Sequence, residues 1–186
     1  VKATTGDGLR LGGNGSYVSD PADPAVVRQG AWAVAIVVEP GETVDQVDTR
    51  TVYAKDNETI HLLYERGEWT LRAENGTGAT AYANASASLD GTTTLSGAYN
   101  ESAGVVELYV NGSLVDTAPY TTETVARDPA ADWIGTVDEV RLWNRSLARS
   151  EHRAYHREPA RAITGARALR LMFDGDRVFT AHFASD

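Results

Sequence analysis

The chain has 186 residues with a formal net charge of −9 at pH 7, and 42% of its residues are hydrophobic. This length suffices for a single core, so we expect residues 1–186 to form one domain, which could be an excised part of a larger surface protein. The negative charge argues against a nucleic-acid partner, since phosphate binding requires clustered Lys and Arg. The absence of cysteine excludes disulfides and thiolate metal sites, and the absence of a long apolar run predicts no membrane span in this sequence.

The first long strand is predicted at 32–38, where Trp32, Val34, Ile36 and Val38 alternate with two alanines and Val37. A run that is apolar on both faces is typical of a strand inside a sandwich. Shorter runs bounded by turn residues predict further strands at 51–54, 59–64, 69–73, 79–89 and 92–99.

Two alternating runs at 105–116 are joined by Asn111-Gly112, the dipeptide that most strongly signals a hairpin. The segment 133–147 then predicts a strand with Asp138 in phase with Val140 and Leu142. A short helix is predicted at 147–156, where apolar residues recur at helical spacing.

Two more alternating runs, 168–173 and 177–183, flank an Asp174-Gly175 turn and predict a final hairpin. Its hydrophobic pattern favours a place in the same sheet. The alternative is that it begins a connection to a further domain.

Two motifs carry a family resemblance. The Leu-Tyr-Val-Asn-Gly of 108–112, followed by Gly135 to Leu147, resembles the paired motifs of the LamG-like branch of the concanavalin A-like lectin/glucanase jelly roll. The segments 9–18 and 95–100 resemble earlier parts of that pattern in the same order. The resemblance implies an all-β, antiparallel two-sheet sandwich with one short helix near residues 147–156, and it says little about the ligand, since the fold hosts many functions.

Every asparagine of the chain begins an N-glycosylation sequon, with Ser or Thr two positions later and no intervening Pro. The seven are Asn14, Asn57, Asn75, Asn84, Asn100, Asn111 and Asn144. We expect a glycosylated, extracellular chain in which not every site is occupied. The alternative is that the Asn-Gly sequons are simply turns, which covers Asn14, Asn75 and Asn111.

Asp138 is the first candidate for a metal ligand. The resemblance implies that an aspartate at this place helps to hold a structural calcium ion, which prefers carboxylate and carbonyl oxygens. Asp174 and Asp176 are the candidates for further ligands, and Asp7 is a weaker one. The alternative is that Asp138 only bonds backbone amides at a strand end.

A candidate carbohydrate platform consists of aromatic residues on the strands that form the concave face in related lectins. These residues are Tyr53, Tyr64, Trp69, Tyr82 and Tyr99. Sugar rings stack on aromatic faces. Core packing is the commoner alternative for each of them.

No catalytic residue is assigned. Glu65 and Glu68 flank a predicted turn rather than sharing the closely spaced strand positions that retaining glucanases use. His152 and His156 lack the intervening Glu of a zinc helix, so a solvated helix face is expected there.

The sequence thus predicts a secreted, glycosylated, lectin-like binding or adhesion module rather than an enzyme. Its partner would be carbohydrate or another surface ligand, at a cell or virion surface. The alternative is a structural subunit of a surface filament or virion spike that mainly packs against copies of itself, and a glycoside hydrolase is a more distant possibility. The predominance of Arg over Lys, with abundant Ala and Asp, resembles the composition of proteins from salt-loving organisms.

Overall fold

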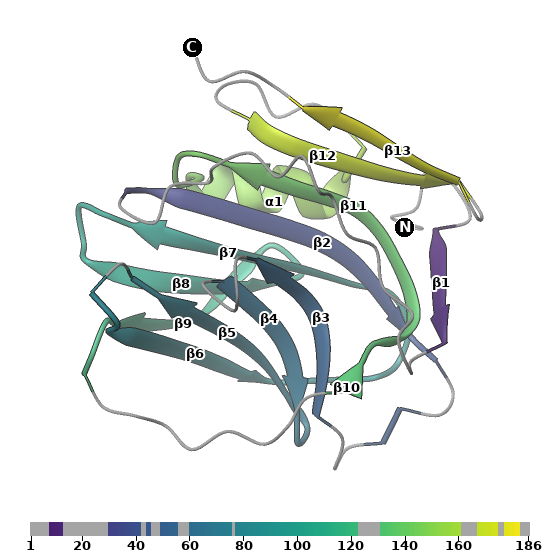
Figure 1. Ribbon diagram of the computed structural model, residues 1–186, viewed down its shortest axis with the longest axis horizontal. Coiled ribbons are helices and arrows are strands. Elements are labelled where there is room, and N and C mark those ends of the chain that lie inside the picture. The colour runs from purple at the N-terminus through teal and green to yellow at the C-terminus, as the bar shows by residue number, and fades with distance from the viewer. Residues whose placement is uncertain are drawn as a thin grey trace.

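The computed structural model describes residues 8–12, 30–41, 44–45, 49–55, 60–75, 77–122, 131–160, 167–174 and 177–182. Of residues 55, 131, 167–174 and 177–182 it describes the backbone without the side chains. Two β-sheets lie face to face, and a short helix covers the outer face of the larger sheet (Figure 1).

The larger sheet, called sheet A, has eight strands in the order β13-β12-β11-β2-β7-β8-β9, with β1 paired to β11 off this path. The smaller sheet, called sheet B, has five strands in the order β10-β3-β4-β5-β6. Neighbouring strands are antiparallel except for β10 and β3, which are parallel. This is the predicted fold class, an antiparallel two-sheet sandwich.

The strands of sheet A are β1 (Leu9–Gly12), β2 (Trp32–Pro40), β7 (Thr93–Asn100), β8 (Val105–Val110), β9 (Ser113–Pro119), β11 (Ile134–Trp143), β12 (Arg167–Asp174) and β13 (Arg177–His182). Those of sheet B are β3 (Thr49–Lys55), β4 (Ile60–Glu65), β5 (Glu68–Glu74), β6 (Thr80–Ser86) and β10 (Ala131–Asp132). The helix is α1 (Arg149–Arg157).

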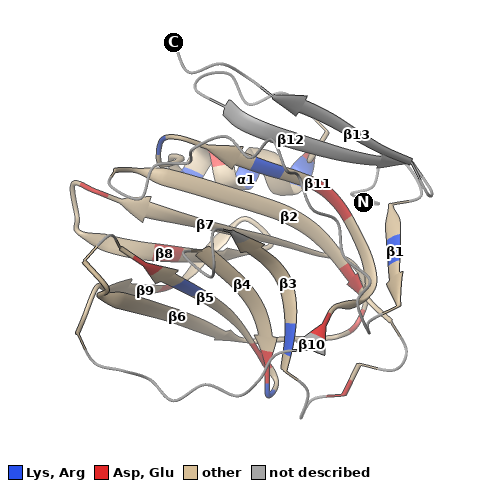
Figure 2. Ribbon diagram, viewed as in Figure 1, with Lys and Arg blue, Asp and Glu red and all other residues tan. Residues whose placement is uncertain are grey.

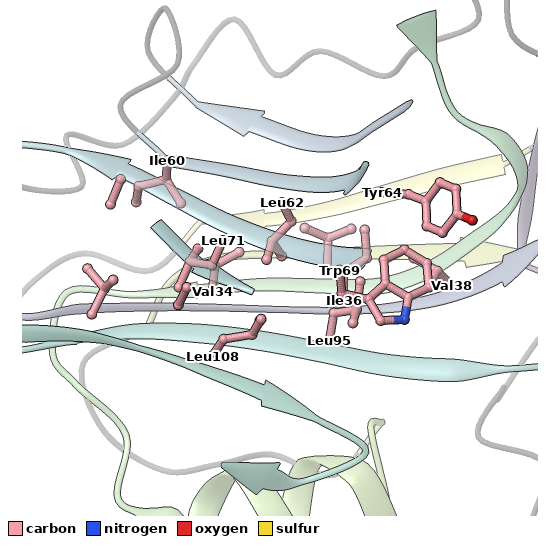
Figure 3. Close-up of a cluster of buried hydrophobic side chains, with 14 of the residues drawn as sticks. Val34, Ile36, Val38, Ile60, Leu62, Tyr64, Trp69, Leu71, Leu95 and Leu108 are labelled. Atoms are coloured by element: carbon pink, nitrogen blue, oxygen red, sulfur yellow. The ribbon is translucent and has the colours of Figure 1, made fainter. Parts of the chain in front are cut away.

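The main core lies between the sheets. Alternate residues of β2 point inward and meet the inward rows of β4, β5, β7 and β8, as Figure 3 shows for Val34, Ile36 and Leu71 among others. Trp69 packs edge-on against Tyr64, with ring centroids 5.4 Å apart. Burial of such side chains stabilises the fold by about 1.5–3 kcal/mol each, so this layer supplies most of the driving force.

A second core joins α1 to the outer face of sheet A. It consists of Ala33, Ala35, Val37, Ala98, Trp143, Leu147 and Tyr155. The small alanines of β2 let the helix approach the sheet closely. The chain therefore needs β2 to be apolar on both faces, as its sequence predicts.

The short helix begins after Ala148, whose backbone N–H donates to the Glu151 carboxylate at 2.8 Å. The same carboxylate receives a two-pronged contact from Arg145, at 2.6 and 2.9 Å. This pairing lowers the pKa of Glu151. The helix predicted at 147–156 is thus present, with its start fixed by a carboxylate in the first turn.

Both predicted hairpins are confirmed. Asn111 and Gly112 have φ angles of 51° and 74°, the left-handed values that a tight turn between β8 and β9 requires. The tail hairpin of β12 and β13 pairs with β11 and so belongs to sheet A. None of the helices among the described residues is long and apolar enough to cross a membrane.

The predicted phase of Asp138 with Val140 and Leu142 is wrong. The register between β11 and β2 shifts between Asp138 and Arg141, and Glu139 adopts a φ of 50°. This bulge inserts an extra residue, so that Val137 and Val140 both join the inter-sheet core. Asp138 is therefore out of phase with Val140.

Candidate functional site

Two tyrosines form an aromatic pair at one end of the sandwich. Tyr99 lies near the end of β7, and Tyr120 directly follows β9; their ring centroids are 5.3 Å apart at an interplanar angle of 66°. The strand pairing of Tyr99 with Val106, and of Val106 with Ala118, brings the two segments together. Both residues are half-buried and pack against the main core, so only part of each is exposed.

The Tyr120 hydroxyl is fixed by its surroundings. Burial raises the pKa of Tyr120 to about 12, and a hydrogen bond with the Trp32 side chain opposes that shift. Trp32 itself is 4% exposed and belongs to the core. The aromatic pair is thus anchored on rigid strands, with its phenol neutral at physiological pH.

The other predicted platform residues lie elsewhere. Tyr64 and Trp69 are 0% and 1% exposed in the inter-sheet core, which is the core-packing alternative for these two rings. Tyr53 is half-buried against the same core. Tyr82 is half-buried on the outer face of sheet B, because its neighbours Ala81 and Ala83 face inward.

Tyr82 belongs to a row of polar residues that crosses sheet B. Cross-strand pairing places His61 opposite Arg72, and Arg72 opposite Tyr82. His61 and Arg72 are 7% and 2% exposed, although they lie on the face away from the core. Tyr82 is therefore the member of this row that a ligand at the surface can reach.

Histidines connect α1 to β7. Ser96 Oγ lies 2.8 Å from His152 Nδ1, and Thr94 Oγ1 lies 2.8 Å from His156 Nδ1. The His152 ring stacks on Tyr109 with centroids 3.6 Å apart, and the Tyr109 hydroxyl donates to Glu107 at 2.6 Å. Burial lowers the pKa of His152 to about 4.

This arrangement has a hydroxyl beside an imidazole, but it is closed to substrates. His152 is 0% exposed and Ser96 is 3% exposed, so the hydrogen bond fastens the helix to the sheet. The expected solvated helix face is correct for His156, which is exposed, and wrong for His152. His152 and Tyr155 supply the buried side of α1.

Over the residues that Figure 2 colours, which leave out β12 and β13, charges are scattered and form no continuous basic stripe. An ion pair between Glu139 and Arg141 is buried beneath α1, with Nη2 and Oε2 3.0 Å apart. The Tyr155 hydroxyl donates to the Glu139 carbonyl oxygen at 2.6 Å. These groups stabilise the bulge in β11.

Glu65 and Glu68 face one another across the turn that joins β4 and β5.

Asp138 is 1% exposed, and its Oδ1 accepts a hydrogen bond from the Glu139 amide at 2.8 Å. Among residues with described side chains, no group of three or more His, Asp or Glu could hold a metal ion. Asp174 is the last residue of β12, described by its backbone, and Asp7 and Asp176 lie outside the described residues. Calcium at this place stays a prediction.

Five of the sequon asparagines lie within the described residues. They are Asn75, Asn84, Asn100, Asn111 and Asn144, whereas Asn14 and Asn57 lie outside. Asn84 and Asn111 are exposed, and the other three are half-buried.

Sequence reasoning missed Tyr120, because it predicts no element between the hairpin at 105–116 and the strand that begins at 133. The signal available was an aromatic residue directly after a strand, beside Pro119. The register of β7, β8 and β9 brings this residue next to Tyr99, and no local sequence pattern specifies that register.

The model of the concanavalin A-like lectin/glucanases superfamily matches residues 12–151. No curated protein matches the chain. Solved structures of similar fold include the binding domain of botulinum neurotoxin DC in complex with rat synaptotagmin II, at 13% identity and a TM-score of 0.52 over 69% of this chain and 35% of that chain. The ligand binding domain of botulinum neurotoxin serotype D in complex with N-acetylneuraminic acid matches at 10% identity and a TM-score of 0.52 over 69% and 36%.

A heptameric SAP-like pentraxin from Limulus polyphemus matches at 11% identity and a TM-score of 0.52 over 82% of both chains. The chain therefore spans about a third of the length of the toxin chains and most of the pentraxin. At these identities the likeness shows the fold.

Proposed function

The chain belongs to the concanavalin A-like lectin/glucanase superfamily, and we propose that it is an extracellular, glycosylated binding or adhesion module that recognises carbohydrate at the Tyr99–Tyr120 pair. The two toxin domains of similar fold are binding domains, and one of them is in complex with N-acetylneuraminic acid. An N-glycosylation sequon at every asparagine of the chain supports an extracellular location.

The observation that carries this proposal is the half-buried aromatic pair at the end of the sandwich. The apolar faces of sugar rings stack on such aromatic surfaces, and rigid tyrosines lose little conformational entropy when they bind. Phenol hydroxyls, which are neutral at physiological pH, can also form hydrogen bonds with sugar hydroxyls. The pair thus offers the two kinds of contact that a shallow sugar site requires.

The second candidate is a structural subunit that packs against copies of itself. It is favoured by the match to a heptameric pentraxin, which covers 82% of each chain. In that case the Tyr99–Tyr120 pair would be buried against a neighbouring copy of the chain. The two functions differ in oligomeric state and in the response to free sugar.

A glycan array tests the proposal, with Tyr99→Ala and Tyr120→Ala as the test variants. Tyr82→Ala is the matched control, because it removes a half-buried tyrosine from a different face. We expect a defined set of glycans to bind the wild type and the control, and binding to fall at least tenfold in both test variants, whose folding is checked by thermal unfolding. Absence of any glycan binding, together with a defined oligomer by light scattering, would support the structural subunit instead.

A further inference from the structure

Asn84 differs from the other described sequon asparagines in what its side chain does. It is exposed in the middle of β6, the edge strand of sheet B, and no hydrogen bond from another described residue engages its carboxamide. Ala83 and Ala85 on either side face the core, so Asn84 and the sequon residue Ser86 share the outer face. A group attached to Asn84 would project into solvent without disturbing the core.

Both the nitrogen and the oxygen of the Asn100 carboxamide form hydrogen bonds within the fold. Its Nδ2 donates to Glu107 Oε1 at 3.1 Å, and its Oδ1 accepts from Ser102 Oγ and the Ala103 amide at 2.8 and 3.2 Å. A glycan on Nδ2 would remove one of the two donors that this nitrogen has and crowd the bond to Glu107.

Of the other three described sequon asparagines, Asn111 and Asn75 are tied into their turns by hydrogen bonds, and Asn144 is partly enclosed. Asn111 Oδ1 accepts from the Thr94 amide at 3.0 Å, which anchors the hairpin turn to β7. Asn144 is half-buried, and its Oδ1 is enclosed with no hydrogen-bond partner among the described residues. Asn75 Oδ1 accepts from the Thr77 amide, the Thr77 hydroxyl and the Ala79 amide, at 3.0, 2.7 and 3.0 Å.

The backbone of Asn84 lies where the edge strand β6 of sheet B meets the edge strand β9 of sheet A; we call this boundary the seam. β6 ends sheet B and β9 ends sheet A, and the Asn84 amide donates to Asp116 Oδ2 of β9 at 2.9 Å. Edge strands offer unpaired backbone groups to other chains, and proteins guard such edges with charges or bulky cover. Asp116 occupies the Asn84 amide, and Thr121 pairs with Thr80 at the start of β6. The part of the edge beyond these two contacts is left to be covered.

Resting on the extracellular, glycosylated function proposed above, we propose that Asn84 carries an N-linked glycan that covers the seam between β6 and β9 and prevents another chain from pairing with β6. The donor is a lipid-phosphate-linked oligosaccharide acted on by an oligosaccharyltransferase. A bond forms between Asn84 Nδ2 and the anomeric carbon of the first sugar, while the bond from that carbon to the phosphate oxygen breaks. The lipid phosphate leaves with the electron pair, and the amide proton passes to solvent.

The test uses the hydroxyl that defines the sequon and leaves Asn84 in place. Ser86→Ala abolishes the sequon, and Ser86→Thr is the matched control that preserves it; Ser86 is exposed, so both variants keep the fold. The chain and both variants are secreted from a glycosylating eukaryotic host, and glycopeptides are mapped by mass spectrometry.

We expect a glycan at Asn84 in the wild type and in Ser86→Thr, and its complete loss in Ser86→Ala. Light scattering should then show that Ser86→Ala self-associates at concentrations where Ser86→Thr stays at the wild-type mass. A folded, secreted wild type with Asn84 bare and Asn100 or Asn144 occupied would overturn the assignment. Equal molecular mass for the two variants at every concentration would overturn the role of the glycan at the edge.

Discussion

Ser96 Oγ and His152 Nδ1 lie 2.8 Å apart between β7 and α1, and both residues are buried. Four residues further along the helix, His156 makes the corresponding contact with Thr94, two residues back along the strand. One helical turn rises by roughly 5.4 Å, which is close to the distance between every second residue of a strand. Residues four apart on the helix can therefore contact residues two apart on the strand. This pair of hydrogen bonds is what holds α1 in register on sheet A.

His152 makes the stability of the protein depend on pH. Its pKa is lowered from 6.5 to about 4, chiefly by burial, while the nearby Glu107 and Glu151 carboxylates partly oppose that shift. Above pH 6.5 the imidazole is neutral in both the folded and the unfolded chain, and it adds no pH dependence. As pH falls from 6.5 towards 4, the unfolded chain binds the proton first, so the free energy of unfolding falls by up to roughly 3 kcal/mol from this group.

Urea unfolding at pH 7 and pH 4.5 measures this effect. We expect the wild type to lose more stability between these values than His152→Gln, whose side chain does not titrate. His156→Gln is the control: partial burial also lowers the pKa of His156, but this residue is exposed and its loss should leave most of the pH dependence intact. The groups around His152, namely Tyr109, Glu107 and Glu151, stay unchanged in both variants. Identical pH dependence in the wild type and His152→Gln would contradict the prediction.

Much of the fold follows from local patterns, because alternation, the Asn111-Gly112 turn and the helical spacing after Leu147 are properties of neighbouring residues. The bulge at Glu139 does not, since an extra residue in β11 is defined only by its register with β2. The solvated face expected at His152 follows from the missing Glu of a zinc helix, and only Ser96 and Tyr109 in distant strands explain the burial of His152. The pairing of Tyr99 with Tyr120 likewise depends on three strands aligning correctly.

Gly97 allows the two sheets to approach each other. A Cβ built on it would lie 2.7 Å from Leu71 Cδ2, a side chain that is 0% exposed in the inter-sheet core. We therefore expect Gly97→Ala to destabilise the protein by about 1–3 kcal/mol through overpacking. Leu71→Ala alone should cost about 2–5 kcal/mol, because it leaves a cavity.

In the Leu71→Ala background the added methyl group has room, so Gly97→Ala should cost far less there or even stabilise. Chemical denaturation of the wild type, both single variants and the double variant gives the coupling free energy, which should exceed about 1 kcal/mol in favour of the double variant. Simple addition of the two single effects would show that Gly97 is required for some reason other than contact with Leu71.

Asp138 stays the candidate for a calcium ligand. One of its oxygens already accepts the Glu139 amide, which is the backbone-bonding alternative. The pairing of β12 with β11 ends with Leu171 opposite Val140, and between Ile134 and Val137 β11 pairs with β1 instead. A calcium ion at Asp138 would take carboxylate and carbonyl oxygens, the ligands that it prefers.

Thermal unfolding with calcium and with a chelator tests this site. A metal at a hundredfold its dissociation constant stabilises by about 2.7 kcal/mol, which corresponds to a shift in Tm on the order of 5–10 °C for a chain of this size. We expect the chelator to lower the Tm of the wild type by this amount and to have no effect on Asp138→Asn. Asp116→Asn, which changes a carboxylate at the β6–β9 seam, should keep the full response to chelator. A wild-type Tm that is the same in calcium and in chelator would leave Asp138 with its hydrogen bond to Glu139 as its whole role.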